Sequence, residues 1–173
     1  PTPSPIPCPT PSDTPTPNRP SYTQEELIMA ARIISQEAGV GQYFRGTDED
    51  VRQVSIAVAW TMRNRIEVGE PIQNQNSMTY RKEDSYTDTF KYYNPYTIGP
   101  LPDTPDSIVL QAVREVFDAQ DRTNDPLQGA IFTVNRACHL KKNLPFVYSI
   151  EWEPLQGGST QGKYFYLNWP GAC

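Results

Sequence analysis

The stretch VRQVSIAVAWTMRNR, residues 51–65, decides how this chain folds. It is apolar on nearly every side from Val54 to Trp60, which is typical of a helix enclosed by other elements. The acids of Thr47-Asp48-Glu49-Asp50 complement the N-terminal end of a helix dipole, so we expect the helix to start there. It turns polar at Arg63-Asn64-Arg65 and should stop at Gly69-Glu70-Pro71. The sequence therefore predicts a central, buried helix.

A second predicted helix lies upstream and carries an acid on its apolar face. Thr23-Gln24-Glu25-Glu26 is a capping box, so this helix should begin at Thr23. Gly39 and Gly41 are expected to end it. Glu37 falls inside the apolar arc, near the end of the helix. The apolar residues that recur at helical spacing are Leu27, Ala30, Ala31, Ile33, Ile34 and Ala38.

The remaining pattern changes from helical to extended along the chain. A third helix is expected after Thr104-Pro105, with the proline at its first position. Its two apolar rows are Ile108, Ala112, Val116 and Val109, Val113, Phe117. Gly157-Gly158 indicates a turn between the last two of three predicted strands. These strands are Ile131–Val134, Phe146–Ile150 and Tyr164–Leu167. We expect an α+β domain, with a helical N-terminal half and a short antiparallel sheet in the C-terminal half.

The first twenty residues have a composition of their own. Half of the 18 prolines among the 173 residues lie there, together with threonine and serine. Such segments are typical of O-glycosylated extracellular stalks or envelope spacers. We therefore divide the chain into an extended Pro/Thr-rich tail, 1–20, and one domain, 21–173. The expected location is extracellular or in the cell envelope, with self-association through the tail.

Cysteine spacing and charge exclude several classes of function. Cys8, Cys138 and Cys173 include no CxxC pair, so we predict no metal site of the four-ligand zinc kind. A disulfide between Cys138 and Cys173 is the first choice, which leaves Cys8 to pair with another chain. The net charge of −5 argues against nucleic-acid binding. We predict no transmembrane segment, and no phosphate-cradling motif indicates a cofactor.

Glu37 is the residue that most directly suggests chemistry. Burial disfavours the charged form of a carboxylic acid, and a protonated acid can give its proton to a leaving oxygen. This hypothesis requires a Glu37 side chain in a groove, without a cationic partner. The alternative is a structural ion pair of Glu37 with one of the arginines Arg32, Arg63 or Arg65.

Three segments, in this order, carry a resemblance to a known family. They are Ser35-Gln36-Glu37-Ala38-Gly39, the stretch 51–65 and Asp125-Pro126-Leu127-Gln128-Gly129-Ala130-Ile131-Phe132. Together they resemble the cell-wall hydrolase family of spore-cortex-lytic enzymes. The resemblance implies a small lysozyme-like fold that acts on the glycan strands of peptidoglycan. It implies that Glu37 is catalytic and that Asn64, Gly129 and Ala130 contribute to the substrate cleft.

The long aromatic stretch 72–104 adds to the resemblance. Tyr93 and Asn94, followed by Pro95, are similar to a segment that borders the family's cleft. The aromatic residues of this stretch are candidates for stacking on sugars or for covering the core. They are Tyr80, Tyr86, Phe90, Tyr92, Tyr93 and Tyr96.

The chain also departs from the family pattern. Lys163 stands where the family usually has a histidine before its final Phe-Tyr pair. Leu127 replaces the threonine of the Asp-Pro-Thr motif, and Val134-Asn135-Arg136 replaces an Asn-Pro. These changes leave the glutamate in place.

The number of acids distinguishes two mechanisms. A hydrolytic glycosidase normally needs two carboxylates. The candidates for a second acid are Asp48, Asp50, Glu83 and Asp84, each of which is also readily explained as a solvated charge. A lytic transglycosylase needs one glutamate only, so a single buried acid favours that chemistry over a muramidase. The alternative function is a structural subunit of an extracellular glycosylated filament or surface layer, with the tail docked on a neighbouring subunit.

Overall fold

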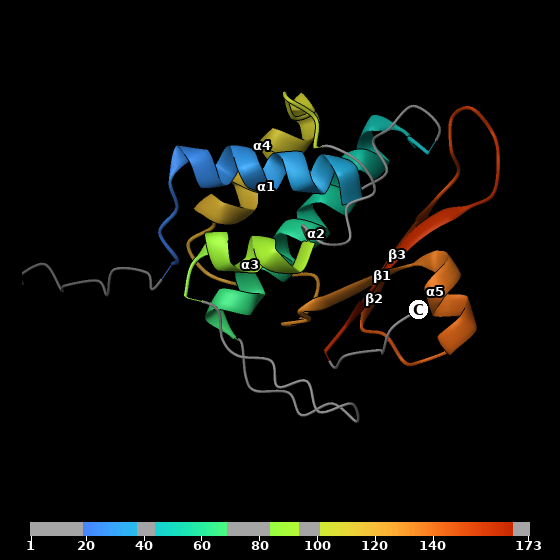
Figure 1. The fold of residues 1–173 in the computed structure, drawn as a ribbon. Coiled ribbons are helices and arrows are strands. Elements are labelled where there is room, and N and C mark those ends of the chain that lie inside the picture. Colours follow the sequence, from blue (N-terminus) through green and yellow to red (C-terminus); the bar gives the residue numbers. More distant parts are fainter. Residues whose placement is uncertain (1–18, 38–43, 69–83, 94–100, 168–173) are drawn as a thin grey trace, which may run out of the picture.

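The computed structural model describes residues 19–37, 44–68, 84–93 and 101–167. Figure 1 shows a group of helices beside a small sheet, with one further helix against the sheet. The helices are α1 (Gln24–Glu37), α2 (Asp48–Glu67), α3 (Tyr86–Tyr93), α4 (Ser107–Asp118) and α5 (Arg136–Lys142). The strands are β1 (Phe132–Asn135), β2 (Tyr148–Trp152) and β3 (Gln161–Tyr166). The predicted α+β class is confirmed.

Helix α2 is the centre of the core, as its sequence predicts. It packs against α4, α1 and α3 and also against strands β1 and β2. The side chain of Thr47 accepts a hydrogen bond from Asp50 N, and the Asp50 side chain accepts one from Thr47 N, which forms a capping box. Trp60 is buried. One helix thus contacts both halves of the domain.

The predicted start of α1 is confirmed, whereas the start of α4 differs. Thr23 and Glu26 exchange capping-box hydrogen bonds of 2.9 and 3.1 Å. In α4 the N-cap is Asp106, whose carboxylate accepts from Ile108 N, so Pro105 precedes the helix and is not its first residue. An acidic N-cap satisfies a free amide at the helix end, which proline cannot do.

The sheet is antiparallel, and β3 is its middle strand, in the order β1-β3-β2. Lys163 in β3 pairs with Asn135 on one side and with Ile150 on the other. Gly157 and Gly158 take positive φ values of 81° and 124° in the predicted turn before β3. All three predicted strands are present, with ends shifted by one to three residues.

Two short helices were not predicted. Helix α3 lies within the stretch that the sequence indicates only as a long aromatic loop. Helix α5 follows β1 directly, and Asn135 caps it by accepting a hydrogen bond from Cys138 N. Helix α3 has 8 residues and α5 has 7, fewer than the stretch over which a helical period can be recognised in a sequence.

Several predictions fall outside the described residues. These are the tail up to residue 18, the glycines expected to end α1, and Asn94. In the described part, no helix has both the length and the apolar character needed to cross a membrane.

Candidate functional site

Glu37 and Lys163 form an ion pair where the helical half meets the sheet. Glu37 is the last residue of α1, and Lys163 lies within β3. The distance from Lys163 Nζ to Glu37 Oε2 is 3.0 Å, and the side chains are 11% and 18% exposed, respectively. A carboxylate at this depth needs a positive partner, because burial of an uncompensated charge is costly. Lys163 supplies that charge.

This pair corrects the sequence-based expectation on two points. The catalytic hypothesis required a Glu37 side chain without a cationic neighbour, and that requirement is not met. A structural pairing was the alternative, but none of the three arginines named for it appears as the partner. Arg32 donates to Pro102 O at 2.6 Å, and Arg65 donates to Ile131 O at 2.9 Å. The partner comes instead from the position at which the family resemblance expects a histidine.

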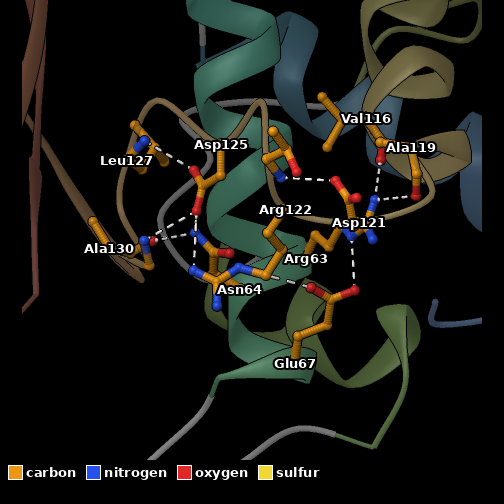
Figure 2. Close-up of polar contacts among 12 residues, drawn as sticks. Arg63, Asn64, Glu67, Val116, Ala119, Asp121, Arg122, Asp125, Leu127 and Ala130 are labelled. Atoms are coloured by element: carbon orange, nitrogen blue, oxygen red, sulfur yellow. Dashed lines mark hydrogen bonds and ion pairs between the residues drawn. The ribbon is translucent and has the colours of Figure 1, made fainter. Parts of the chain in front are cut away.

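The third arginine, Arg63, has a structural task that the sequence did not indicate. It is 1% exposed, although its stretch looked like a polar helix end. Its Nη1 donates to Val116 O at 2.8 Å and to Ala119 O at 2.7 Å, so it binds two carbonyls at the C-terminal end of α4. Its Nε donates to Glu67 at 2.8 Å, as Figure 2 shows.

Asn64 joins α2 to the segment that precedes β1. It is fully buried, and its Nδ2 donates to Asp125 Oδ2 at 3.0 Å and to Ala130 O at 3.1 Å (Figure 2). The structure thus brings together Asn64, Gly129 and Ala130, which the resemblance groups at one site. Because Asn64 and Ala130 are buried, the observed contribution of both is to position the segment.

Asp125 organises this segment from within. Its carboxylate accepts hydrogen bonds from Leu127 N at 2.8 Å and Gly129 N at 3.0 Å, and it pairs with Arg122 at 3.1 Å. Gly129 has a φ of 90°, a conformation that side chains disfavour, and an added Cβ would lie 3.0 Å from Arg122 Nη2. The Asp-Pro-Leu-Gln-Gly motif is therefore a tight, carboxylate-centred turn. The sequence suggested a cleft segment but not this central role of Asp125.

The candidates for a second acid are used elsewhere or exposed. Asp48 is 78% exposed and pairs with Arg45 at 2.8 Å. Asp50 caps α2. Asp84 is exposed, and Glu83 lies outside the described residues. None of the described candidates forms a hydrogen bond or an ion pair with Glu37.

Of the aromatic candidates for stacking on sugars, one belongs to the core and another has an undescribed side chain. Tyr86 is fully buried and stacks on Phe117 with ring centroids 3.8 Å apart, and burial raises the pKa of its hydroxyl. It is therefore part of the core and not a platform for sugars. Tyr93 is the last residue of α3, and its side chain lies outside what the structure describes, as does Asn94.

A second polar cluster lies between α5 and the outer face of the sheet. The ring of His139 stacks on that of Tyr164 at 3.8 Å, and its Nδ1 lies 2.6 Å from the hydroxyl of Tyr166. The hydroxyl of Tyr164 donates a short hydrogen bond to Glu151, which also pairs with Arg136 at 2.9 Å. The bond from Tyr164 lowers the pKa of Glu151, and burial together with this bond raises the pKa of Tyr164 to about 12. These contacts fasten α5 to the sheet.

Cys138 is buried in α5 and is disulfide-bonded. The other two cysteines, Cys8 and Cys173, lie outside the described residues, so the pairing of Cys138 with Cys173 stays a prediction. Among the described residues, no group of three or more His, Cys, Asp or Glu side chains could hold a metal ion.

Comparisons with known proteins do not identify the chain. No family model, no curated protein and no solved structure matches it significantly. A functional interpretation therefore depends on the residues themselves.

Proposed function

We propose that this domain cleaves glycan strands of peptidoglycan, with Glu37 as the catalytic acid and base. The observation that carries the proposal is the placement of Glu37 at the end of α1, beside the middle strand of the sheet, with a side chain that is still 18% exposed. A carboxyl group in this position is held between two elements and keeps part of its surface exposed to solvent. The segment resemblance described above supplies the substrate class, and the domain is expected to act outside the cell or in the envelope.

The chemistry needs one acid only. Glu37 donates a proton to the glycosidic oxygen, and the bond from this oxygen to the anomeric carbon breaks. The 6-hydroxyl of the same sugar attacks that carbon and returns its proton to Glu37, which leaves a 1,6-anhydro ring. Atoms and charges balance without a water molecule. Asp48 pairs with Arg45 and Asp50 belongs to the capping box of α2, so the proposal assigns the chemistry to Glu37 alone.

Glu37 is paired with Lys163, unlike the unpaired side chain that the sequence-based hypothesis required, so the proposal has to accommodate this pair. In the resting state the Lys163 ammonium neutralises the Glu37 carboxylate. Before Glu37 can donate a proton it must gain one, and the ion pair is then lost. The contact between Lys163 and Glu37 therefore has to open before Glu37 acts as the acid.

Digestion of purified peptidoglycan tests the proposal. The wild-type protein should release muropeptides with 1,6-anhydro ends, and the Glu37→Gln variant should release none. Lys142→Gln, at an exposed lysine of α5, is the matched control and should retain activity. Intact peptidoglycan after long incubation with folded wild-type protein would refute the proposal.

The structural-subunit alternative has an observation in its favour. The Glu37–Lys163 pair links the helical half to the sheet, which is also what a purely structural ion pair would do. In that case Glu37→Gln would lower the free energy of unfolding, no glycan product would appear, and the wild-type protein would assemble through its tail. Electron microscopy of the full chain, with and without residues 1–20, distinguishes this outcome.

A further inference from the structure

We infer that the tail of one copy of this chain pairs with the sheet of a second copy, as a fourth strand at the free edge of β2. The pairing segment is residues 1–11, in which prolines alternate with other residues. It lies outside the described residues, so its pairing is deduced from its residue types. The inference goes beyond the proposed function, because neither Glu37 nor a glycan takes part in it.

The prolines of this segment follow a strict period of two. They stand at every odd position from Pro1 to Pro11, and the even positions are Thr2, Ser4, Ile6, Cys8 and Thr10. In an extended chain, successive residues direct their backbone N–H and C=O groups to opposite edges of the strand. All N–H groups of the segment therefore lie along one edge, and the other edge carries carbonyl groups only. Such a segment is suited to be the last strand of a sheet, where proline is tolerated with its nitrogen directed away from the neighbouring strand.

Strand β2 has an edge with which this segment can pair. It lies at the margin of the sheet, in the order β1-β3-β2. Among the described residues, its backbone is hydrogen-bonded to β3 only. The margin at β1 is less suitable, because Arg65 binds the carbonyl group of Ile131 directly before the strand and α5 begins directly after it. An added strand is bound mainly by main-chain hydrogen bonds, which the free edge of β2 can supply.

Exposed apolar side chains lead into β2. Leu144 and Phe146 are 39% and 43% exposed, although both are large and apolar. The Phe146 ring packs edge-on against Tyr164 of β3, with ring centroids 4.9 Å apart. In an extended tail the proline rings all project from one face of the strand, since side chains alternate between the two faces. This apolar stripe can cover the exposed surface at the start of β2.

The geometry of the chain favours a second copy over the same copy. At the beginning of the described part, Arg19 Nη1 donates to Asp118 O at the end of α4, at 3.1 Å. Figure 1 shows this beginning at the end of α1 that is farther from the sheet. Helix α1 has 14 residues, which corresponds to a length of about 21 Å. The tail would have to turn back along this length to reach its own β2, whereas it can reach the sheet of a neighbour without a turn.

The pairing has a consequence for the form of the assembly. The tail of one copy meets a different surface on the next copy, so the contact is head-to-tail and gives rings or open chains. The outward edge of the docked tail has no N–H group from Pro1 to Pro11, so it cannot donate to a fifth strand. Assembly is therefore expected to proceed from copy to copy without lateral aggregation of sheets.

Moving prolines within the full chain tests the pairing without changing the folded domain. Ser4→Pro/Thr10→Pro removes two N–H groups from the pairing edge. The matched control Pro5→Ala/Pro9→Ala changes two residues of the same segment and keeps every pairing N–H. In sedimentation velocity over a range of concentrations, the wild type and the control should assemble. For Ser4→Pro/Thr10→Pro, the concentration needed for assembly should rise roughly tenfold or more, because two hydrogen bonds per contact are lost.

Amide hydrogen exchange locates the contact. Exchange at Tyr148–Trp152 should be slower in the assembled wild type than in the dilute protein, and exchange at Phe132–Asn135 should be unchanged. A wild type that stays monomeric, equal assembly of Ser4→Pro/Thr10→Pro, or unchanged exchange in β2 would each overturn the inference. Slow exchange in β2 of a monomer that becomes fast in Ser4→Pro/Thr10→Pro would place the tail on its own sheet and overturn the pairing between copies.

Discussion

The ammonium of Lys163 contacts the carboxylate of Glu37 at 3.0 Å, although 126 residues separate them in the chain. One belongs to the first helix and the other to the middle strand of the sheet. The contact therefore joins the two halves of the domain by a partly buried ion pair. The contribution of this ion pair to the free energy of unfolding can be measured with a double-mutant cycle.

Replacement of Lys163 by methionine should destabilise the protein at neutral pH. The Glu37 carboxylate would keep its position but lose its counter-charge, at a cost of about 1–3 kcal/mol, since both side chains retain some solvent. Urea unfolding of Lys163→Met, Glu37→Gln and the double variant gives the coupling. The double variant should be less destabilised than the sum of the two single ones. Strict additivity would mean that the pair does not contribute.

Arg63 should be among the most sensitive positions of the core. Arg63→Met leaves two carbonyl groups at the end of α4 and the Glu67 carboxylate without this donor. We expect a loss of about 3–5 kcal/mol in the free energy of unfolding, as for other buried pairs that lose one partner. Arg52→Met is the matched control, because its pair with Glu115 is largely exposed. It should cost less than about 1 kcal/mol. Equal effects of the two changes would contradict the burial argument.

Asn64→Ala should loosen the segment before β1. The Asp125 carboxylate and the Ala130 carbonyl both lose Asn64 Nδ2 as a hydrogen-bond donor. The expected cost in the free energy of unfolding is about 1–3 kcal/mol. Amide hydrogen exchange should rise at Gly129, whose N–H binds the same carboxylate. Gln53→Ala, at an exposed position of the same helix, should leave that exchange unchanged. Unaltered protection of Gly129 in Asn64→Ala would refute the anchoring role.

The hydrogen bond between Tyr164 and Glu151 predicts a defined pH dependence. It lowers the pKa of Glu151 in the folded state below its ordinary value of 4.5. Stability from this carboxylate is therefore present above pH 4.5 and is lost as the pH falls through the lowered pKa. In Tyr164→Phe the pKa of Glu151 should rise toward 4.5, and the acid dependence of stability should become shallower. NMR titration of the glutamate carboxyls measures this, and Tyr148→Phe on β2 should leave the pKa of Glu151 unchanged.

Local signals predicted much of the fold. Capping boxes and the apolar stripes of α1 and α4 depend on residues within one or two turns, so they can be recognised in a single sequence. Asparagine is a favoured N-cap, so Asn135 could have indicated the start of α5. The strand-like pattern of β1, which ends at the same residue, hid this signal.

The contacts of the candidate site were less predictable. The groups that bind its side chains are far away in the sequence or are backbone carbonyls. The carbonyl groups that bind Arg63 and Arg65 carry no mark in the sequence, so the burial of this polar stretch at the end of the helix was not predicted. Glu37 was recognised from its helical phase. Its partner was not, because the register of Lys163 opposite Ile150 and its approach to α1 arise only from tertiary packing.

The most direct test of Glu37 as a single acid is cleavage of purified peptidoglycan in water enriched in heavy oxygen, with the products analysed by mass spectrometry. The proposed mechanism predicts that every new end is a 1,6-anhydro sugar without heavy oxygen, and that Glu37→Gln gives no such ends. Heavy oxygen in new reducing ends would show that water attacks instead, and the appearance of no new ends at all would contradict catalysis by this domain.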